Sequence, residues 1–384
     1  MSVKQTQSRN PPKIIPERIR EAREASGQTA EEFADNIGVT RQAVGQYEIG
    51  QSSPSAEVMG RIIAETGQPP AFFTTERRRN SSLFRRPFWR SLKRMERNHR
   101  LRVKRRLEWA YDIVQYIEQY IDLPNVDLPE VRFDWQAPEI EMFEQIEIIA
   151  ETLRQHWGIG LGPISGFENL LESNGFILIR ESVNCDDMDA VSRWQGGRPY
   201  ILFSKDVEST PRCLFNIAHE LGHVLLHSDL EVDADNLNKV EKQANRFAGA
   251  FLLPRASFSN EVIGSSLKHF EYLKERWGAS IAAMIYRAKD LEIITNNQYV
   301  YLVKQMNSKQ MRFNEPLDDY FPAPQPSVLI ESLKMLIDHN VQSKSDIEDG
   351  LGINAEDIEN LCGAEKGFLN NKVVSLNLQP KYMN

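Results

Sequence analysis

The spacing of apolar and polar residues divides the 384-residue chain into four regions. Residues 14–73 repeat apolar positions three and four apart, which predicts a run of short amphipathic helices. Residues 139 to about 320 combine helical spacing with the short apolar runs GFILIRE and RPYILFS, which predict buried strands. The pattern therefore predicts a multidomain, mainly α protein with an all-α domain at the N-terminus and an α+β domain in its second half. The expected boundaries are 1–75 for the first domain, 76–138 for a long basic helix and a Pro-rich linker, 139–322 for the α+β domain, and 323–384 for a small helical module.

Two of the N-terminal helices are predicted within TAEEFADNIG and VTRQAVGQYEIG. Thr29 is placed to cap the first helix, and Glu32, three residues later, completes a capping box. Gly38 allows the chain to turn, and Thr40 caps the second helix. The predicted inner faces consist of Phe33, Ala34 and Ile37 in the first helix and of Val44 and Tyr47 in the second.

This arrangement leaves Arg41, Gln42 and Gln46 facing outward near the start of the second helix. In the major groove, arginine pairs bidentately with guanine and glutamine with adenine, so these residues are candidates for reading base edges. Residues 16–72 resemble the XRE family of helix-turn-helix DNA-binding domains, and Thr40 also matches the family pattern at a DNA-binding position. Ala30 departs from that pattern, because the family usually has a phosphate-contacting glutamine there. The alternative is a helical protein-interaction module.

Charge is distributed unevenly along the chain. The net charge is −8, yet residues 77–106 contain fourteen Lys or Arg and a single acid, Glu96. Apolar residues recur at helical spacing from Phe88 to Ile121, which predicts a long helix. Two interpretations stay open: an arm that contacts phosphates and pairs the chain into a homodimer, or a basic helix packed on its own chain.

The stretch HELGHVLLH contains a candidate metal site. His219 and His223 are four residues apart on a predicted helix, so they project from one face and can share one ion. Zinc with three protein ligands keeps a fourth position for water, and Glu220, between the histidines, is placed to act as general base. His227 lies about 12 Å from His219 along the helix axis, too far to share the ion. It is expected to be a helix-end residue that lines the cleft.

The third ligand must then come from another part of the chain, and EKQANRFAGAFLLP is the best candidate. Glu241 shares a predicted helix face with Ala244 and Ala248, whose small side chains allow a close approach to the HELGH helix. Asn245, one turn after Glu241, is placed to hold an imidazole N–H. The alternatives are an exposed helix charge for Glu241 and a purely structural pair for the two histidines.

The segments RCLFNIAHELGHVLLH, EKQANRFAGAFLLP and LKERWGASIAAMIYRAKDLEIIT resemble the ImmA/IrrE family of metallopeptidases over about residues 140–318. The resemblance implies a zincin-like fold, one Zn²⁺ per chain on His219, His223 and Glu241 (with Mn²⁺ as the in vivo alternative), and Glu220 as the catalytic residue. Members are cytoplasmic, and several act on transcriptional repressors in stress or mobile-element responses. Members with an N-terminal XRE domain also occur.

Together these features predict a transcription regulator that binds a double-stranded DNA operator and carries a zinc metalloendopeptidase. Its expected substrate is a repressor, an antitoxin or a toxin. The alternative is a non-cleaving repressor or antitoxin whose zinc domain senses a ligand or binds a partner protein. Three cysteines and the absence of a long apolar run predict a cytoplasmic protein without a membrane contact. Cys185 is a candidate for holding the open zinc position in a latent state.

Overall fold

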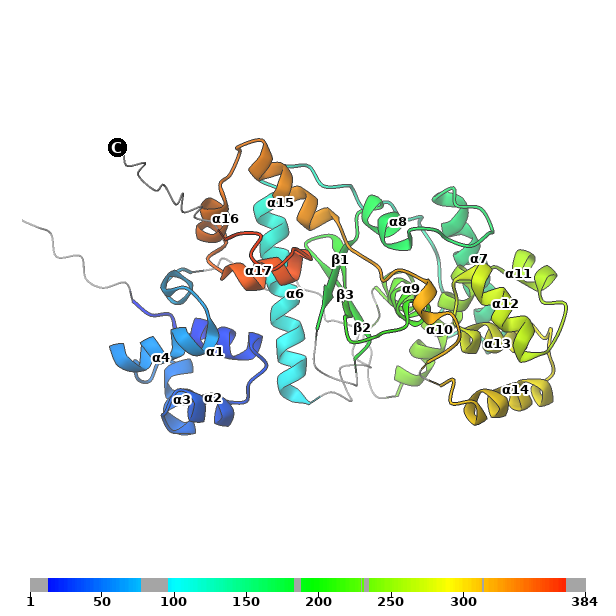
Figure 1. Ribbon diagram of the computed structural model, residues 1–384, viewed down its shortest axis with the longest axis horizontal. Helices are drawn as coiled ribbons and strands as arrows, with labels where there is room; N and C mark the ends of the chain where they lie inside the picture. The colour runs from blue at the N-terminus through cyan, green and yellow to red at the C-terminus, as the bar shows by residue number, and fades with distance from the viewer. Residues whose placement is uncertain are drawn as a thin grey trace, which may run out of the picture.

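The computed structural model describes residues 13–76, 96–182, 188–228, 230, 235–312 and 314–370 (Figure 1). Cys185 and basic residues 77–95 lie outside these ranges, and so does the start of the predicted long helix. The elements are α1 Pro16–Ala25, α2 Ala30–Asn36, α3 Arg41–Glu48, α4 Ala56–Thr66, the 3-10 helix η1 Pro70–Phe73, α6 Arg97–Ile117, α7 Glu139–His156, α8 Phe167–Ser173, β1 Ile177–Glu181, β2 Ala190–Gln195, β3 Arg198–Ser204, α9 Thr210–Leu226, α10 Leu237–Leu252, α11 Arg255–Glu261, α12 Leu267–Trp277, α13 Ile281–Asp290, α14 Asn296–Ser308, the 3-10 helix η3 Asp318–Tyr320, α15 Val328–Asp338, α16 Lys344–Leu351 and α17 Ala355–Cys362.

The described β structure is a three-stranded sheet of order β1-β3-β2. Strand β3 pairs in parallel with β1 and antiparallel with β2. Both predicted strands are confirmed, but β2 was not predicted. Gly196 and Gly197 join β2 to β3 with φ values of +59° and +80°. Positive φ at both central residues is what a two-residue type I′ hairpin requires, so this Gly-Gly pair was an available local signal.

The two faces of the sheet are buried in different cores, because successive strand residues point to opposite sides. One face packs toward α6 and contributes Ile177, Ile179, Val191, Tyr200 and Leu202. The other face packs toward α9 and α10 and contributes Leu178, Ala190, Ile201 and Phe203. The sheet therefore lies between the α6 layer and the pair of helices that carries the candidate metal ligands (Figure 1). Helices α11–α14 form a third apolar core.

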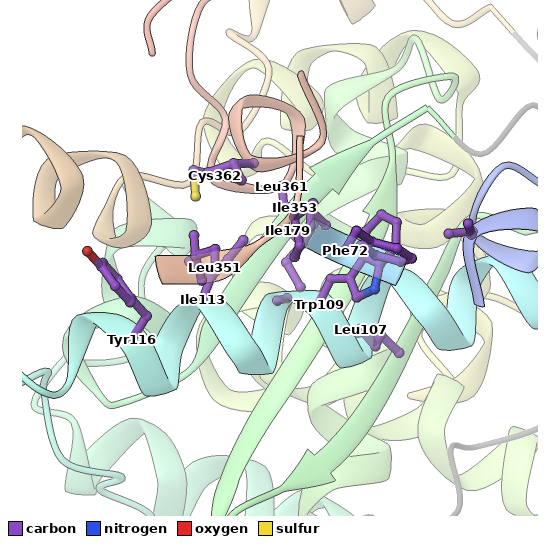
Figure 2. Close-up of a cluster of buried hydrophobic side chains, with 14 of the residues drawn as sticks. Phe72, Leu107, Trp109, Ile113, Tyr116, Ile179, Leu351, Ile353, Leu361 and Cys362 are labelled. Atoms are coloured by element: carbon purple, nitrogen blue, oxygen red, sulfur yellow. The ribbon is translucent and has the colours of Figure 1, made fainter. Parts of the chain in front are cut away.

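Helix α6 is central to the first core. Figure 2 shows Leu107, Trp109 and Ile113 of α6 among apolar residues from the N-terminal helices, β1 and the C-terminal helices, namely Phe72, Ile179, Leu351, Ile353, Leu361 and Cys362. For residues 97–117 the structure supports the second interpretation of the basic stretch, a helix packed on its own chain. The predicted carboxyl end at Ile121 was wrong, since the helix ends at Ile117 and a turn follows.

Several basic side chains of α6 are paired within the chain. Arg106 is buried and forms ion pairs with Glu181 of β1 and Asp357 of α17. Arg105 donates to Glu24 of α1 at 2.8 Å. These guanidinium groups hold the N-terminal helices, the sheet and the C-terminal helices together, so they are not the phosphate contacts that the first interpretation assigned to them.

Helices α9 and α10 approach each other closely. A Cβ atom placed on Gly222 would lie 3.1 Å from the Phe247 ring and 3.3 Å from the Ala244 Cα. Ala244 faces α9 at this contact, as predicted, and both Ala244 and Ala248 are fully buried. This contact brings residue 241 beside the HELGH segment. Within the described ranges, no helix is both long and apolar enough to cross a membrane.

Candidate functional site

The candidate metal centre forms where α9 and α10 face each other. One ligand atom from each of His219, His223 and Glu241 lies within 4.8 Å of the other two. The Nε2 atoms of the two histidines are 3.0 Å apart. The Glu241 oxygens lie 3.3 Å from His219 Nε2 and 3.5 Å from His223 Nε2. All three donors therefore point at one shared position.

This donor set fits zinc. Two imidazole nitrogens and one carboxylate oxygen are a ligand combination of catalytic zinc sites, which keep a fourth position open. The His219 side chain is 15% exposed, whereas those of His223 and Glu241 are 3% and 8% exposed. A cation at the shared position would be held mainly by protein atoms and would be reached from the His219 side.

Electrostatics keep Glu241 ionised. Burial by itself would raise the pKa of Glu241, but hydrogen bonds and charge from His219 and His223 hold that pKa well below its usual range. Burial also disfavours a charged His219, yet the pairing with Glu241 raises the pKa of His219 above its ordinary value. Glu241 is thus available as an anionic ligand at neutral pH.

The outer nitrogen of each histidine contacts a different partner. His219 Nδ1 lies 3.0 Å from Asn245 Oδ1, the residue expected to hold an imidazole N–H. His223 Nδ1 lies 3.0 Å from His227 Nδ1, and His227 Nε2 lies 2.8 Å from Gln243 Oε1. His227 is the C-cap residue of α9, which confirms the predicted helix-end position, but the expectation that it lines the cleft was wrong, because its side chain is completely buried. Nothing local in the sequence marked Gln243.

Glu220 lies on α9 between His219 and His223, and it is buried. Its carboxylate accepts a 2.6 Å hydrogen bond from the Ser192 hydroxyl. Ser192 lies on β2, the strand that was not predicted, so Ser192 was not predicted as a site residue either. Its hydroxyl holds one oxygen of the Glu220 carboxylate, Oε2, in a defined position. The Gly-Gly turn could have revealed the strand, although not the hydrogen bond.

The helix-turn-helix region forms as the capping residues predict. Thr29 and Glu32 make a complete capping box at α2, and the Thr40 hydroxyl accepts from the Ala43 N–H at the start of α3. Gly38, in the turn between the helices, has a φ of +65°. Of the residues expected to face inward, Phe33, Ala34, Ile37 and Val44 are buried, and Tyr47 is half-buried and packs against the same core.

The outer face of α3 is open at its amino end. Arg41 and Gln42 are exposed, as is Thr40, while Gln46 is half-buried. The other end of α3 is anchored, since buried Glu48 accepts from Arg23 of α1 at 2.5 Å and 3.0 Å. Anchoring one end while exposing the other gives α3 a fixed orientation for a partner surface.

Comparison with protein families identifies both regions. Residues 172–289 match the family described as IrrE N-terminal-like domain, a metallopeptidase-type family. Residues 19–73 match the helix-turn-helix family. The order of the two matches is the one that the resemblances implied. No curated protein matches the chain.

Proposed function

Starting from a chain that joins a helix-turn-helix domain to an IrrE N-terminal-like domain, we propose a DNA-bound regulator that hydrolyses a peptide bond in a protein substrate. The substrate is another regulator, namely a repressor, an antitoxin or a toxin, and the response is to stress or to mobile elements. The protein acts in the cytoplasm as a homodimer. The observation that carries the proposal is the convergence of His219, His223 and Glu241 beside the buried carboxylate of Glu220.

His219 and His223, each through Nε2, and Glu241, through a carboxylate oxygen, are the residues that would hold one Zn²⁺. Zinc, when bound, polarises a peptide carbonyl and lowers the pKa of a coordinated water to about 7. The outer contacts of the two histidines, to Asn245 and His227, keep their inner nitrogens directed at the shared position.

Glu220 is the general base. Its carboxylate accepts a proton from the attacking water and passes that proton to the leaving amine. The hydrogen bond from Ser192 occupies Oε2 and leaves Oε1 as the oxygen that exchanges the proton. Because the carboxylate is already held in one orientation, it loses less conformational entropy on reaching the transition state.

The N-terminal domain would position this chemistry on a double-stranded DNA operator. Arg41, Gln42 and Gln46 would read base edges from the major groove, and Thr40 would contact the backbone at the start of α3. The exposure of Thr40, Arg41 and Gln42 supports this assignment.

Replacing Glu220 with glutamine tests the hydrolysis. Glu220→Gln keeps all three ligands, so the variant should bind zinc and fold normally but hydrolyse the substrate about 10²–10⁴-fold more slowly. Proteins that shorten on induction of the wild type would be identified by mass spectrometry and compared with cells expressing the variant. Glu275→Gln, the same change at an exposed position of α12, serves as the control and should cleave normally.

One observation favours the second candidate, a non-cleaving repressor or antitoxin that senses a ligand or binds a partner. Measured over the whole residue, Glu220, His223 and Glu241 are each only 3–6% exposed, a degree of enclosure that also suits a small-ligand or structural zinc centre. If Glu220→Gln regulates its target gene as the wild type does, and no protein is shortened in either strain, the second candidate replaces the first.

A further inference from the structure

The two ligand histidines are held by chemically different groups. An asparagine oxygen, which only accepts hydrogen bonds, contacts His219 Nδ1. The partner of His223 Nδ1 is another imidazole nitrogen, which donates in one tautomer and accepts in the other. Whether His223 presents a lone pair at the metal position therefore depends on what sets the tautomer of His227.

Gln243 sets the tautomer of His227, because the contacts of its NH₂ group fix the orientation of its amide. Its Nε2 faces the Trp135 carbonyl oxygen at 3.4 Å and the Met142 sulfur at 2.7 Å. Both of these atoms are acceptors, so the NH₂ group must point toward them and the amide oxygen toward His227. The distance from Gln243 Oε1 to His227 Nε2 is 2.8 Å.

The remaining protons follow in order. Since Gln243 Oε1 accepts, His227 Nε2 carries the hydrogen, and Nδ1 of the neutral ring is left with a lone pair. His223 Nδ1 must then donate to His227 Nδ1, and the lone pair of His223 falls on Nε2. That atom lies beside Glu241 and the Nε2 of His219, where a zinc ligand needs its lone pair.

We propose that Gln243 and His227, here called the relay, are positioning residues that set the His223 tautomer required for zinc binding. The proposal rests on the metal centre of the proposed function but not on hydrolysis. In the opposite tautomer His227 Nε2 and Gln243 Oε1 would face each other as two acceptors. Both relay side chains are completely buried, so water cannot compensate for such a mismatch.

Packing supports the same arrangement. The Phe133 ring lies 6.1 Å from the His227 ring at an interplanar angle of 72°, so the imidazole is held by an apolar neighbour as well as by its hydrogen bonds. Met142 and Trp135 come from α7 and the linker before it, which places the far end of the relay outside the α9–α10 pair. The orientation of His223 thus depends on how α7 packs against α10.

Nitrogen NMR of the histidine-labelled, zinc-loaded protein tests the proton positions directly. His227 should show a protonated Nε2 and an unprotonated Nδ1, and His223 a protonated Nδ1. The reversed pattern at His227 would overturn the proposal, whatever the zinc affinity.

Substitution tests the consequence for the metal. His227→Phe fills the site but cannot accept a hydrogen bond, and Gln243→Leu removes the group that orients His227. Each should weaken zinc binding about 10–100-fold in competition with a chelator, while one zinc still binds at saturation. His227→Gln retains an acceptor for the His223 Nδ1–H and a donor for Gln243 Oε1, so it should recover most of the affinity.

His269→Phe is the matched control, because His269 lies on α12 and contacts a backbone carbonyl of Glu261. It should leave zinc affinity unchanged. Wild-type affinity in folded Gln243→Leu protein would overturn the relay. No substrate is needed in these assays, so a chain that behaves as expected here yet hydrolyses nothing would refute the proposed function alone.

Discussion

Among the buried clusters of this protein that contain carboxylates, two achieve charge balance in different ways. At the junction of α6, β1 and α17, the charge of Glu181 is met by Arg106, which also pairs with Asp357. At the candidate metal centre, the charge of Glu241 faces the imidazoles of His219 and His223. A guanidinium is always cationic, whereas an imidazole that ligates a metal is neutral.

The junction is therefore complete as it stands. Burial by itself would lower the pKa of Arg106, but Glu181 and Asp357 raise that pKa above its ordinary value, so the guanidinium stays cationic between the two carboxylates. The metal centre instead directs an anion and two nitrogen lone pairs at one position. The difference shows that a buried carboxylate indicates a structural role when the chain provides an arginine, and a binding role when it provides lone-pair donors.

Removing one buried carboxylate from each cluster gives the largest expected contrast. Glu241→Ala should lose bound zinc and hydrolysis together, because one of three ligands is gone. Glu181→Ala should keep one zinc per chain. Metal analysis of the purified variants decides the matter, with His227→Ala as a further comparison that should retain stoichiometric zinc. If Glu241→Ala retained zinc, Glu241 would not be a metal ligand and the two carboxylates would not differ in role.

Arg106→Met should lower the free energy of unfolding by about 3–5 kcal/mol, since it removes the guanidinium that pairs with buried Glu181 and half-buried Asp357. Zinc affinity of the folded variant should be unchanged. The double variant Arg106→Met with Glu181→Met should recover part of the loss, because apolar replacement of a buried ion pair is often neutral. Chemical denaturation measures both. A double variant less stable than the single one would mean that the junction depends on more than charge matching.

Arg41 offers a sharper version of the comparison, since it is an exposed arginine with no ion-pair partner within the described ranges. If it reads a base, Arg41→Ala should reduce discrimination at one operator position by about 1–3 kcal/mol and leave zinc binding unchanged. Gln42→Ala should act similarly at another position. Selection from a randomised DNA pool, followed by titration of single-base variants, measures the preference. Equal loss of affinity for all sequences would assign Arg41 to phosphate instead.

The smallest effect is expected at an exposed pair. A hydrogen bond from Arg255, with its charge, lowers the pKa of Glu144 below 4.5. A lowered carboxyl pKa contributes stability above the unfolded value, and that stability is lost as the pH falls through the folded pKa. Glu144→Gln should cost less than about 1 kcal/mol at pH 7 and slightly flatten the loss of stability below pH 4.5. Thermal melts at pH 3–7 test the change in slope.

Much of the local structure was predictable from the sequence, because its causes lie within a few residues. The capping box of Thr29 and Glu32 depends on a spacing of three, and the shared stripe of His219 and His223 on a spacing of four. Strands β1 and β3 are short apolar runs, and their burial follows from composition. Strand β2 carried a local signal as well, in its Gly-Gly turn.

What only the tertiary structure decided are the contacts between segments far apart in the chain. Ser192 reaches Glu220 across 28 positions, and Gln243 reaches His227 across 16. Arg106 reaches Asp357 across 251 positions. Contacts of this kind place the basic helix α6 at the centre of the first core. Hydrophobic periodicity shows which face of an element is buried but not what it is buried against. The partners of buried polar groups are chosen by close packing, such as that of Gly222 against Ala244, which exists only after the chain has folded.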